Sequence, residues 1–168
     1  MNVTVNVFDP RDMQLATNEI EEYLADLQIK ANEICERLAS IGAVSASFGF
    51  RNAIYSGAND TQISVEPIEN GYAIHARGNA VLFIEFGSGA TYGYGHPEPG
   101  EYGPGTFPGK GHWNDPKGWW FPKDSIDAQT GSDRYVHSYG NPPAAAMYEA
   151  QQEVIRRIQE VADEVFAT

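Results

Sequence analysis

The sequence predicts an α+β fold in which two long amphipathic helices pack with a small antiparallel sheet. Three observations predict it. Apolar residues recur every three or four positions in two stretches, 20–41 and 147–166. Between them, 62–78 alternates in the manner of a β-hairpin. A stretch rich in Gly, Pro and aromatic residues then separates this hairpin from the last helix. The 168 residues, 42% of them hydrophobic, predict a single domain spanning 1–168.

The first segment alternates like a short strand. Val3, Val5 and Val7 are separated by polar residues, and Asp9 and Pro10 end the pattern.

The first long helix is predicted from a repeat with alternating steps of four and three residues. Asn18 and Glu21 fit a capping box, which predicts the start, and Gly42 predicts the end. Acidic residues occupy the opposite face, so the apolar stripe could pack internally or against a neighbouring subunit. The stripe consists of Ile20, Leu24, Leu27, Ala31, Ile34, Leu38 and Ile41.

The hairpin is predicted to turn at Asn70 and Gly71, a pair that favours a type I′ turn. Glu69 then pairs with Tyr72, and Pro67 leaves an open edge on its strand. In this register Glu66 pairs with His75 and Ser64 with Arg77 on one face, and Ile63, Val65, Pro67, Tyr72, Ile74 and Ala76 share the other.

The apolar run at 80–86 fits either a buried strand or a short helix stopped by Gly87. The helix is favoured because Leu82, Phe83 and Phe86 then share a face, and glycine readily adopts the left-handed stop.

Residues 88–141 are predicted to form an extended loop or arm, because they are rich in Gly and Pro and show little helix or strand patterning. A structureless segment this long usually has a function. Within it, 117–122 and 134–138 predict a second hairpin or an arm. The last helix is predicted to begin at Pro142 and Pro143, where missing N–H groups cost nothing. Its stripe consists of Met147, Val154, Ile158, Val161 and Val165, backed by Ala150, Ile155, Ala162 and Phe166.

Charge and composition argue against several classes of protein. The net charge of −12 argues against sequence-specific DNA binding. Only −2 of it falls in 87–141, so this segment suits burial against a partner. No apolar run approaches the roughly 20 residues of a membrane span, and the N-terminus lacks a signal-peptide pattern, which predicts cytosolic synthesis and no membrane contact. The single cysteine, Cys35, excludes an intrachain disulfide and fits a buried thiol.

No catalytic constellation is complete. His96, His112, His137 and Asp115 could gather on a metal, but none has a close ligand spacing. Surface or capping histidines are therefore favoured over a metal site, for these and for the fourth histidine, His75.

Glu85 is the lone charge in its apolar run. It fits either a general acid with a raised pKa or, as the favoured interpretation, a carboxylate bound to the amides of Gly87 and Gly89 or to a cation. Ser88 lacks the Gly-x-Ser-x-Gly context of a nucleophile elbow.

The loop carries many aromatic side chains, which could stack on sugar rings, line a protein interface or form a small core of their own. They are Tyr92, Tyr94, Tyr102, Phe107, Trp113, Trp119, Trp120 and Phe121.

Two segments resemble a family of tailed-phage neck or tail-completion proteins, also labelled minor capsid or head–tail joining proteins. The run AVLFIEFGSG at 80–89 resembles the family's apolar run followed by Val/Ile-Glu-Phe/Tyr-Gly-Thr. GWWF at 118–121 and HSYGNPPAAAMYEA at 137–150 are similar to its aromatic hairpin and closing helix. The resemblance covers about 19–166. Ser88 replaces the usual Thr, and 89–118 is longer and richer in Gly and Pro.

The resemblance implies a structural virion protein at the head–tail interface, without enzymatic activity, cofactor or metal. It implies a ring of identical subunits, sixfold or twelvefold, that contacts other neck, connector and tail-terminator proteins while DNA passes without specific binding. Glu85, Phe86 and Gly87 would fix where the aromatic arm leaves the core, and the eight aromatic residues above would form the interface. The alternatives are a cell-wall glycan-binding module and a phage-associated hydrolase that uses Glu85 or the loop histidines.

Overall fold

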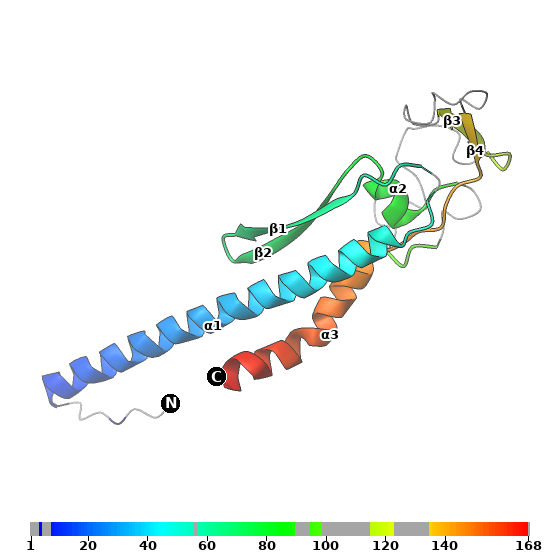
Figure 1. Cartoon of the computed structure of the whole chain (residues 1–168). Coiled ribbons are helices and arrows are strands. Elements are labelled where there is room, and N and C mark those ends of the chain that lie inside the picture. Colours follow the sequence, from blue (N-terminus) through cyan, green and yellow to red (C-terminus); the bar gives the residue numbers. More distant parts are fainter. Residues whose placement is uncertain are drawn as a thin grey trace.

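The computed structural model describes residues 4, 8–55, 57–89, 95–98, 115–122 and 135–167. The fold is α+β, as predicted: a long helix α1 packs against a C-terminal helix α3 and a two-stranded antiparallel sheet (Figure 1). The strand predicted at 3–7 lies, except for Thr4, outside the described residues. The elements are α1 (Pro10–Arg51), β1 (Gln62–Ile68), β2 (Gly71–Arg77), α2 (Val81–Phe86), β3 (Trp119–Pro122), β4 (Tyr135–Ser138) and α3 (Ala146–Ala167).

Helix α1 is longer than predicted at both ends. It begins at Pro10, and the Asp9 carboxylate accepts a hydrogen bond from the Arg11 amide at 2.9 Å. The predicted capping box is therefore wrong, because Asp9 and Pro10 supply an earlier start and Asn18 accepts a bond from the Gln14 side chain instead.

Gly42 does not stop α1, which continues to Arg51. A Cβ atom at Gly42 would lie 2.6 Å from Ile74 Cδ1 and 2.9 Å from Val154 Cγ2. The glycine is there because β2 and α3 both approach the helix closely at this point.

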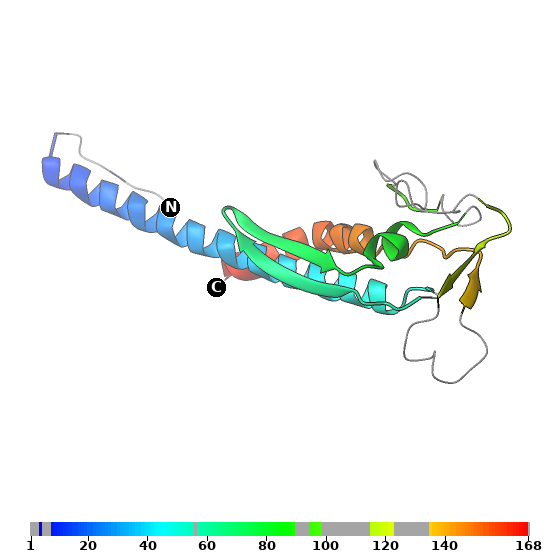
Figure 2. The same cartoon turned by 90° about the horizontal axis from the view of Figure 1, so that it is seen from above.

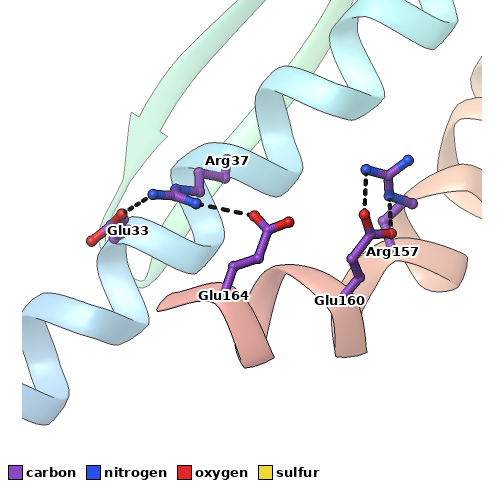
Figure 3. Close-up of polar contacts among 5 residues, drawn as sticks. All are labelled: Glu33, Arg37, Arg157, Glu160 and Glu164. Atoms are coloured by element: carbon purple, nitrogen blue, oxygen red, sulfur yellow. Dashed lines mark hydrogen bonds and ion pairs between the residues drawn. The ribbon is translucent and has the colours of Figure 1, made fainter. Parts of the chain in front are cut away.

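Helices α1 and α3 are antiparallel. A Cβ atom at Gly49 would lie 2.7 Å from the Ala146 Cβ, which places the start of α3 beside the end of α1. Farther along, the Arg37 guanidinium lies 2.5 Å from Glu33 and 3.4 Å from Glu164 of α3 (Figure 3). Figure 3 also shows an ion pair within α3, between Arg157 and Glu160, at 2.8 Å.

The first hairpin lies along α1 (Figure 2) and differs from the prediction in register. Pro67 pairs with Tyr72 and Ile68 with Gly71, two residues from the predicted pairing, so Glu66 lies opposite Ala73. The turn is Glu69 and Asn70; neither has a positive φ, and Gly71 takes φ 141° instead. The predicted type I′ turn is therefore wrong.

The faces of the hairpin are as predicted, because a shift of two residues preserves them. Glu66 still reaches its predicted partner His75 diagonally, at 3.4 Å, and it also lies 2.7 Å from Arg77. The Arg77 hydrogen bond is the main cause that lowers the pKa of Glu66 below its ordinary value.

The core centres on α2. Phe50, Ala80, Ile84 and Ala146 form its buried cluster, and α2 is the short helix that the sequence favoured. The predicted second hairpin is confirmed by the antiparallel pairing of β3 with β4.

Helix α3 begins at Ala146, three residues after the predicted proline start at Pro143. The amides of Ala144 and Ala145 donate to the carbonyls of Ile84 and Glu85, at 2.7 and 3.0 Å. These residues therefore complete the end of α2 rather than the start of α3.

Candidate functional site

The junction between α2 and α3 is built around one buried carboxylate. Glu85, in the last turn of α2, is only 5% exposed. Its Oε2 accepts from the Met147 amide at 2.9 Å, and its Oε1 accepts from the Tyr148 amide at 3.2 Å. These amides belong to the first turn of α3, so Glu85 caps that helix and its charge meets the positive end of the helix dipole. The partners expected at Gly87 and Gly89 are therefore not the ones found.

His96 completes the set of donors. Its Nε2 lies 3.2 Å from Glu85 Oε1, and its Nδ1 accepts the Glu98 amide hydrogen at 3.0 Å. Because Nδ1 is an acceptor, the proton of the neutral imidazole is on Nε2 and is donated to Glu85. The ring also contacts Phe86 and Tyr148, with centroids at 4.6 and 5.9 Å. These contacts of His96 therefore hold residues 95–98 against the start of α3.

A second set of contacts joins Ser88 to Asn141. Their backbones exchange two hydrogen bonds, at 2.9 and 3.1 Å, and the Ser88 hydroxyl donates to the Asn141 side-chain oxygen. The Asn141 side-chain amide donates to the Phe83 carbonyl at 2.9 Å. The Ser88 hydroxyl thus serves a structural role, as the donor of a hydrogen bond to Asn141.

Gly87 is required at this junction. It has φ 77°, and a Cβ atom there would lie 2.7 Å from the Pro143 nitrogen. A residue with a side chain would be strained by the backbone conformation and would clash with the 141–143 segment.

Asp60 holds the other end of α2. Its carboxylate accepts from the amides of Asn79 and Ala80, at 2.8 and 3.1 Å, and from the Asn79 side chain at 2.8 Å. The Asn79 amide is the main cause that lowers the pKa of Asp60 below its ordinary value.

The β3–β4 hairpin offers a separate, aromatic surface. Trp120 is 67% and Tyr139 is 60% exposed, and the His137 ring lies between them with both centroids at 4.6 Å. Trp119 points to the other face of the strand, where it lines a cavity of about 190 Å³ with Tyr55, Phe83, Ser88, Ser138 and Asn141. The outer face of this hairpin therefore presents the rings of Trp120 and Tyr139 to solvent.

The structure brings some of the predicted site residues together. Glu85, Phe86 and Gly87 meet at the α2–α3 junction, and the backbones of Trp119, Trp120 and Phe121 form β3. The other predicted interface residues, together with His112, lie outside the described residues: Tyr92, Tyr94, Tyr102, Phe107 and Trp113.

The remaining histidines have separate surroundings. His75 faces Glu66 on the first hairpin, whereas His96 contacts Glu85 and His137 contacts Trp120. Within the part of the chain that the structure describes, no three His, Cys, Asp or Glu residues are placed to hold a metal ion.

Sequence reasoning missed Asn141 and Asp60, and it named His96 only as a possible metal ligand or as a surface or capping histidine. The position of Asn141 directly before two prolines was a usable signal. Prolines have no N–H to donate, so an asparagine side chain is well suited to make the hydrogen bonds that hold this stretch of backbone. No signal in the sequence paired His96 with Glu85, since this contact is set by tertiary structure.

Comparisons of the chain with protein-family models, with curated proteins and with solved structures find no match. Among the described residues, no helix has both the length and the apolar character of a membrane span.

Proposed function

We propose that this chain is a structural virion protein of a tailed bacteriophage, a neck or tail-completion component that joins the DNA-filled head to the tail as a ring of identical subunits. The observation that carries the proposal is the bonding of the Glu85 carboxylate, which lies in the segment that resembles such proteins. Its two oxygens accept from Met147, Tyr148 and His96. This supports a structural use of the motif.

The motif at 80–89 lies where the 89–140 segment joins the rest of the protein. The bonds between Ser88 and Asn141 hold the two ends of the 89–140 segment against each other. The two ends of the segment therefore lie side by side, and the contact of His96 with Glu85 holds residues 95–98 at the same junction. Such an anchor suits an arm that reaches a neighbouring subunit, and a heterologous contact of this kind is what a ring requires.

The acidic charge also supports the proposal. With a net charge of −12, the chain repels the phosphates of a passing duplex, and DNA would move past it without adhering.

The test is electron microscopy of particles from the encoding phage with an early stop codon in this gene. We expect DNA-filled heads and separate tails that do not join, with joining restored by the gene supplied in trans. Normal joined particles would remove the proposal.

A hydrolase that uses Glu85 has less support. A general acid must offer its proton to substrate, whereas the Glu85 side chain is buried and its oxygens accept bonds from the protein. Cleavage of peptidoglycan by the purified protein would restore this alternative.

The exposed rings of Trp120 and Tyr139 favour a second candidate function, cell-wall glycan binding, because such rings stack on sugars. Retention on purified peptidoglycan that is lost in Trp120→Ala would support it. Tyr23→Ala is the matched control, since Tyr23 is also an exposed aromatic residue but lies on α1.

A further inference from the structure

A groove, here named the α1–β1 groove, runs between β1 and the last turns of α1. It has a volume of about 380 Å³, and its lining includes Val44, Phe48 and Arg51 of α1 and Ile63 and Val65 of β1. Val44 and Phe48 lie about one helical turn apart and are both 71% exposed. The groove therefore has an apolar surface that is open to solvent.

The β1 side of the groove is an unpaired strand edge. Among the described residues, β1 pairs with β2 alone. Counted from the two-residue turn of the hairpin, the register places the backbone groups of every second residue of β1 on its outer edge. These residues are Ile63, Val65 and Pro67, and a proline fits such an outward position because it has no N–H to pair. One further strand can therefore pair at Ile63 and Val65, with its alternate side chains facing α1.

One end of the groove lies where the chain passes from α1 to β1. Helix α1 ends at Arg51 and β1 begins at Gln62, so residues 52–61 connect the two elements there. The Asn59 side-chain amide donates to the Phe50 carbonyl at 2.8 Å, which ties this connection to the last turn of α1. A strand that runs antiparallel to β1 reaches this end with its C-terminus. A chain end fits there better than a continuing chain.

The same end of the groove offers groups that bind a carboxylate. An adjoining pocket of about 310 Å³ has Arg51 and Thr61 in its lining. Within the part of the chain that the structure describes, the Arg51 guanidinium has no ion-pair partner. The Thr61 hydroxyl is buried and has no hydrogen-bond partner there, which is costly, and a rotation about χ1 would turn it toward the pocket. The two side chains together supply donors for a carboxylate.

The C-terminus of this chain does not fit the groove. Helix α3 continues to Ala167, so neither this copy nor a second one has an extended C-terminal tail of more than one residue. In the same copy, Phe166 lies beside Lys30, which is about 30 Å along α1 from Arg51. The occupant is therefore sought in a different protein.

We propose that the α1–β1 groove binds the C-terminal tail of a partner protein as an extended strand, antiparallel to β1. The backbone of the tail pairs with the edge at Ile63 and Val65. Its alternate apolar side chains pack on Val44 and Phe48, and its terminal carboxylate binds Arg51. This mode of recognition takes its affinity from main-chain hydrogen bonds and its specificity from the side-chain contacts and the captured carboxylate. The inference goes beyond the proposed function and does not depend on it.

Peptide selection tests the proposal. The probe is a library of short random peptides with free C-termini, displayed at the C-terminal end of a carrier protein and selected on the purified chain. We expect enriched sequences in which apolar and polar residues alternate. In fluorescence anisotropy, an enriched peptide should bind at least about tenfold more tightly than its C-terminal amide, which lacks the charge-assisted bonds. Equal binding of acid and amide, or no enrichment over the unselected library, would overturn the proposal.

Two variants and two matched controls locate the site. Phe48→Ser and Arg51→Gln should each weaken the binding of an enriched peptide at least about tenfold. Leu24→Ser and Arg156→Gln should leave it unchanged, because Leu24 is an exposed apolar residue of α1 outside the groove and Arg156 is an exposed arginine of α3. Undiminished binding by both groove variants would place the peptide elsewhere and overturn the proposal.

Hydrogen exchange tests the strand pairing itself. The bound peptide should slow the exchange of the Ile63 and Val65 amide hydrogens, followed by NMR. Unchanged exchange at both positions, with the peptide bound, would overturn strand addition. All these measurements use the purified chain, whereas microscopy of mutant particles reports the place in the virion, so this inference and the proposed function fail separately.

Discussion

The Glu85 carboxylate is the single group on which the α2–α3 junction depends most. We expect Glu85→Ala to lower the free energy of unfolding by roughly 3 kcal/mol, because it uncaps α3 and leaves the buried His96 Nε2–H without an acceptor. Urea denaturation followed by circular dichroism measures this change.

Glu149→Ala is the control for Glu85→Ala. Glu149 lies in the same first turn of α3 but is exposed, so its loss should cost less than about 1 kcal/mol. Equal losses from the two variants would contradict the assignment of Glu85 as the cap.

Asp60 gives a pH-dependent prediction. Its folded-state pKa is lowered by the Asn79 and Ala80 amides, so its contribution to stability is present above the unfolded-state pKa and is lost as pH falls through the folded one. Wild type should therefore exceed Asp60→Asn in stability at pH 7, and the difference should shrink below about pH 4. Urea titrations at pH 7, 4 and 2.5 measure it; a difference that stays constant would contradict the capping role.

At the scale of single residues, the sequence predicted that the Glu85 carboxylate is bonded but did not predict its partners. A lone carboxylate in an apolar run had to be bonded or neutral, and that much followed from the cost of burying charge. The partners lie at Met147 and Tyr148, about sixty residues away, and only the folded chain brings them together.

At the scale of the secondary-structure elements, α1 and α3 approach each other closely at Gly49 and Ala146. We expect Gly49→Ala to destabilise the protein by roughly 1–2 kcal/mol, although alanine favours helix formation, because the new methyl group would overlap the Ala146 backbone and side chain. Thermal and urea unfolding measure the change. Ser40→Ala, at an exposed position of the same helix, should be neutral or slightly stabilising; a stabilising Gly49→Ala would show that the helices are not closely packed there.

The elements themselves were largely predictable, and their boundaries were not. Periodicity identified both long helices and the faces of the first hairpin, but a slip of two residues leaves those faces unchanged, so the pattern could not fix the register. Gly42 shows the same limit for helices, because a glycine that ends a helix and one that admits a close neighbour look alike in sequence.

For the whole molecule, the length of α1 relative to α3 sets the shape. The periodicity predicted one continuous apolar stripe on α1, but not that α3 would reach only to Lys30 and that residues 10–29 of α1 would extend past its end. The part of α1 beyond the end of α3 therefore exposes apolar side chains such as Ile20 and Leu24.

The net charge then predicts how self-association responds to salt. Each copy carries −12, so long-range repulsion opposes association at low ionic strength, whereas exposed apolar side chains of α1 such as Ile20 and Leu24 supply attraction that salt does not screen. We expect light scattering at fixed protein concentration to show larger species in 0.5 M than in 0.02 M NaCl. Ile20→Glu, which places a charge within the exposed apolar stripe of α1, should remain monomeric at both salt concentrations. Oligomers that dissociate as salt rises would instead indicate a contact held by ion pairs and would contradict an apolar contact.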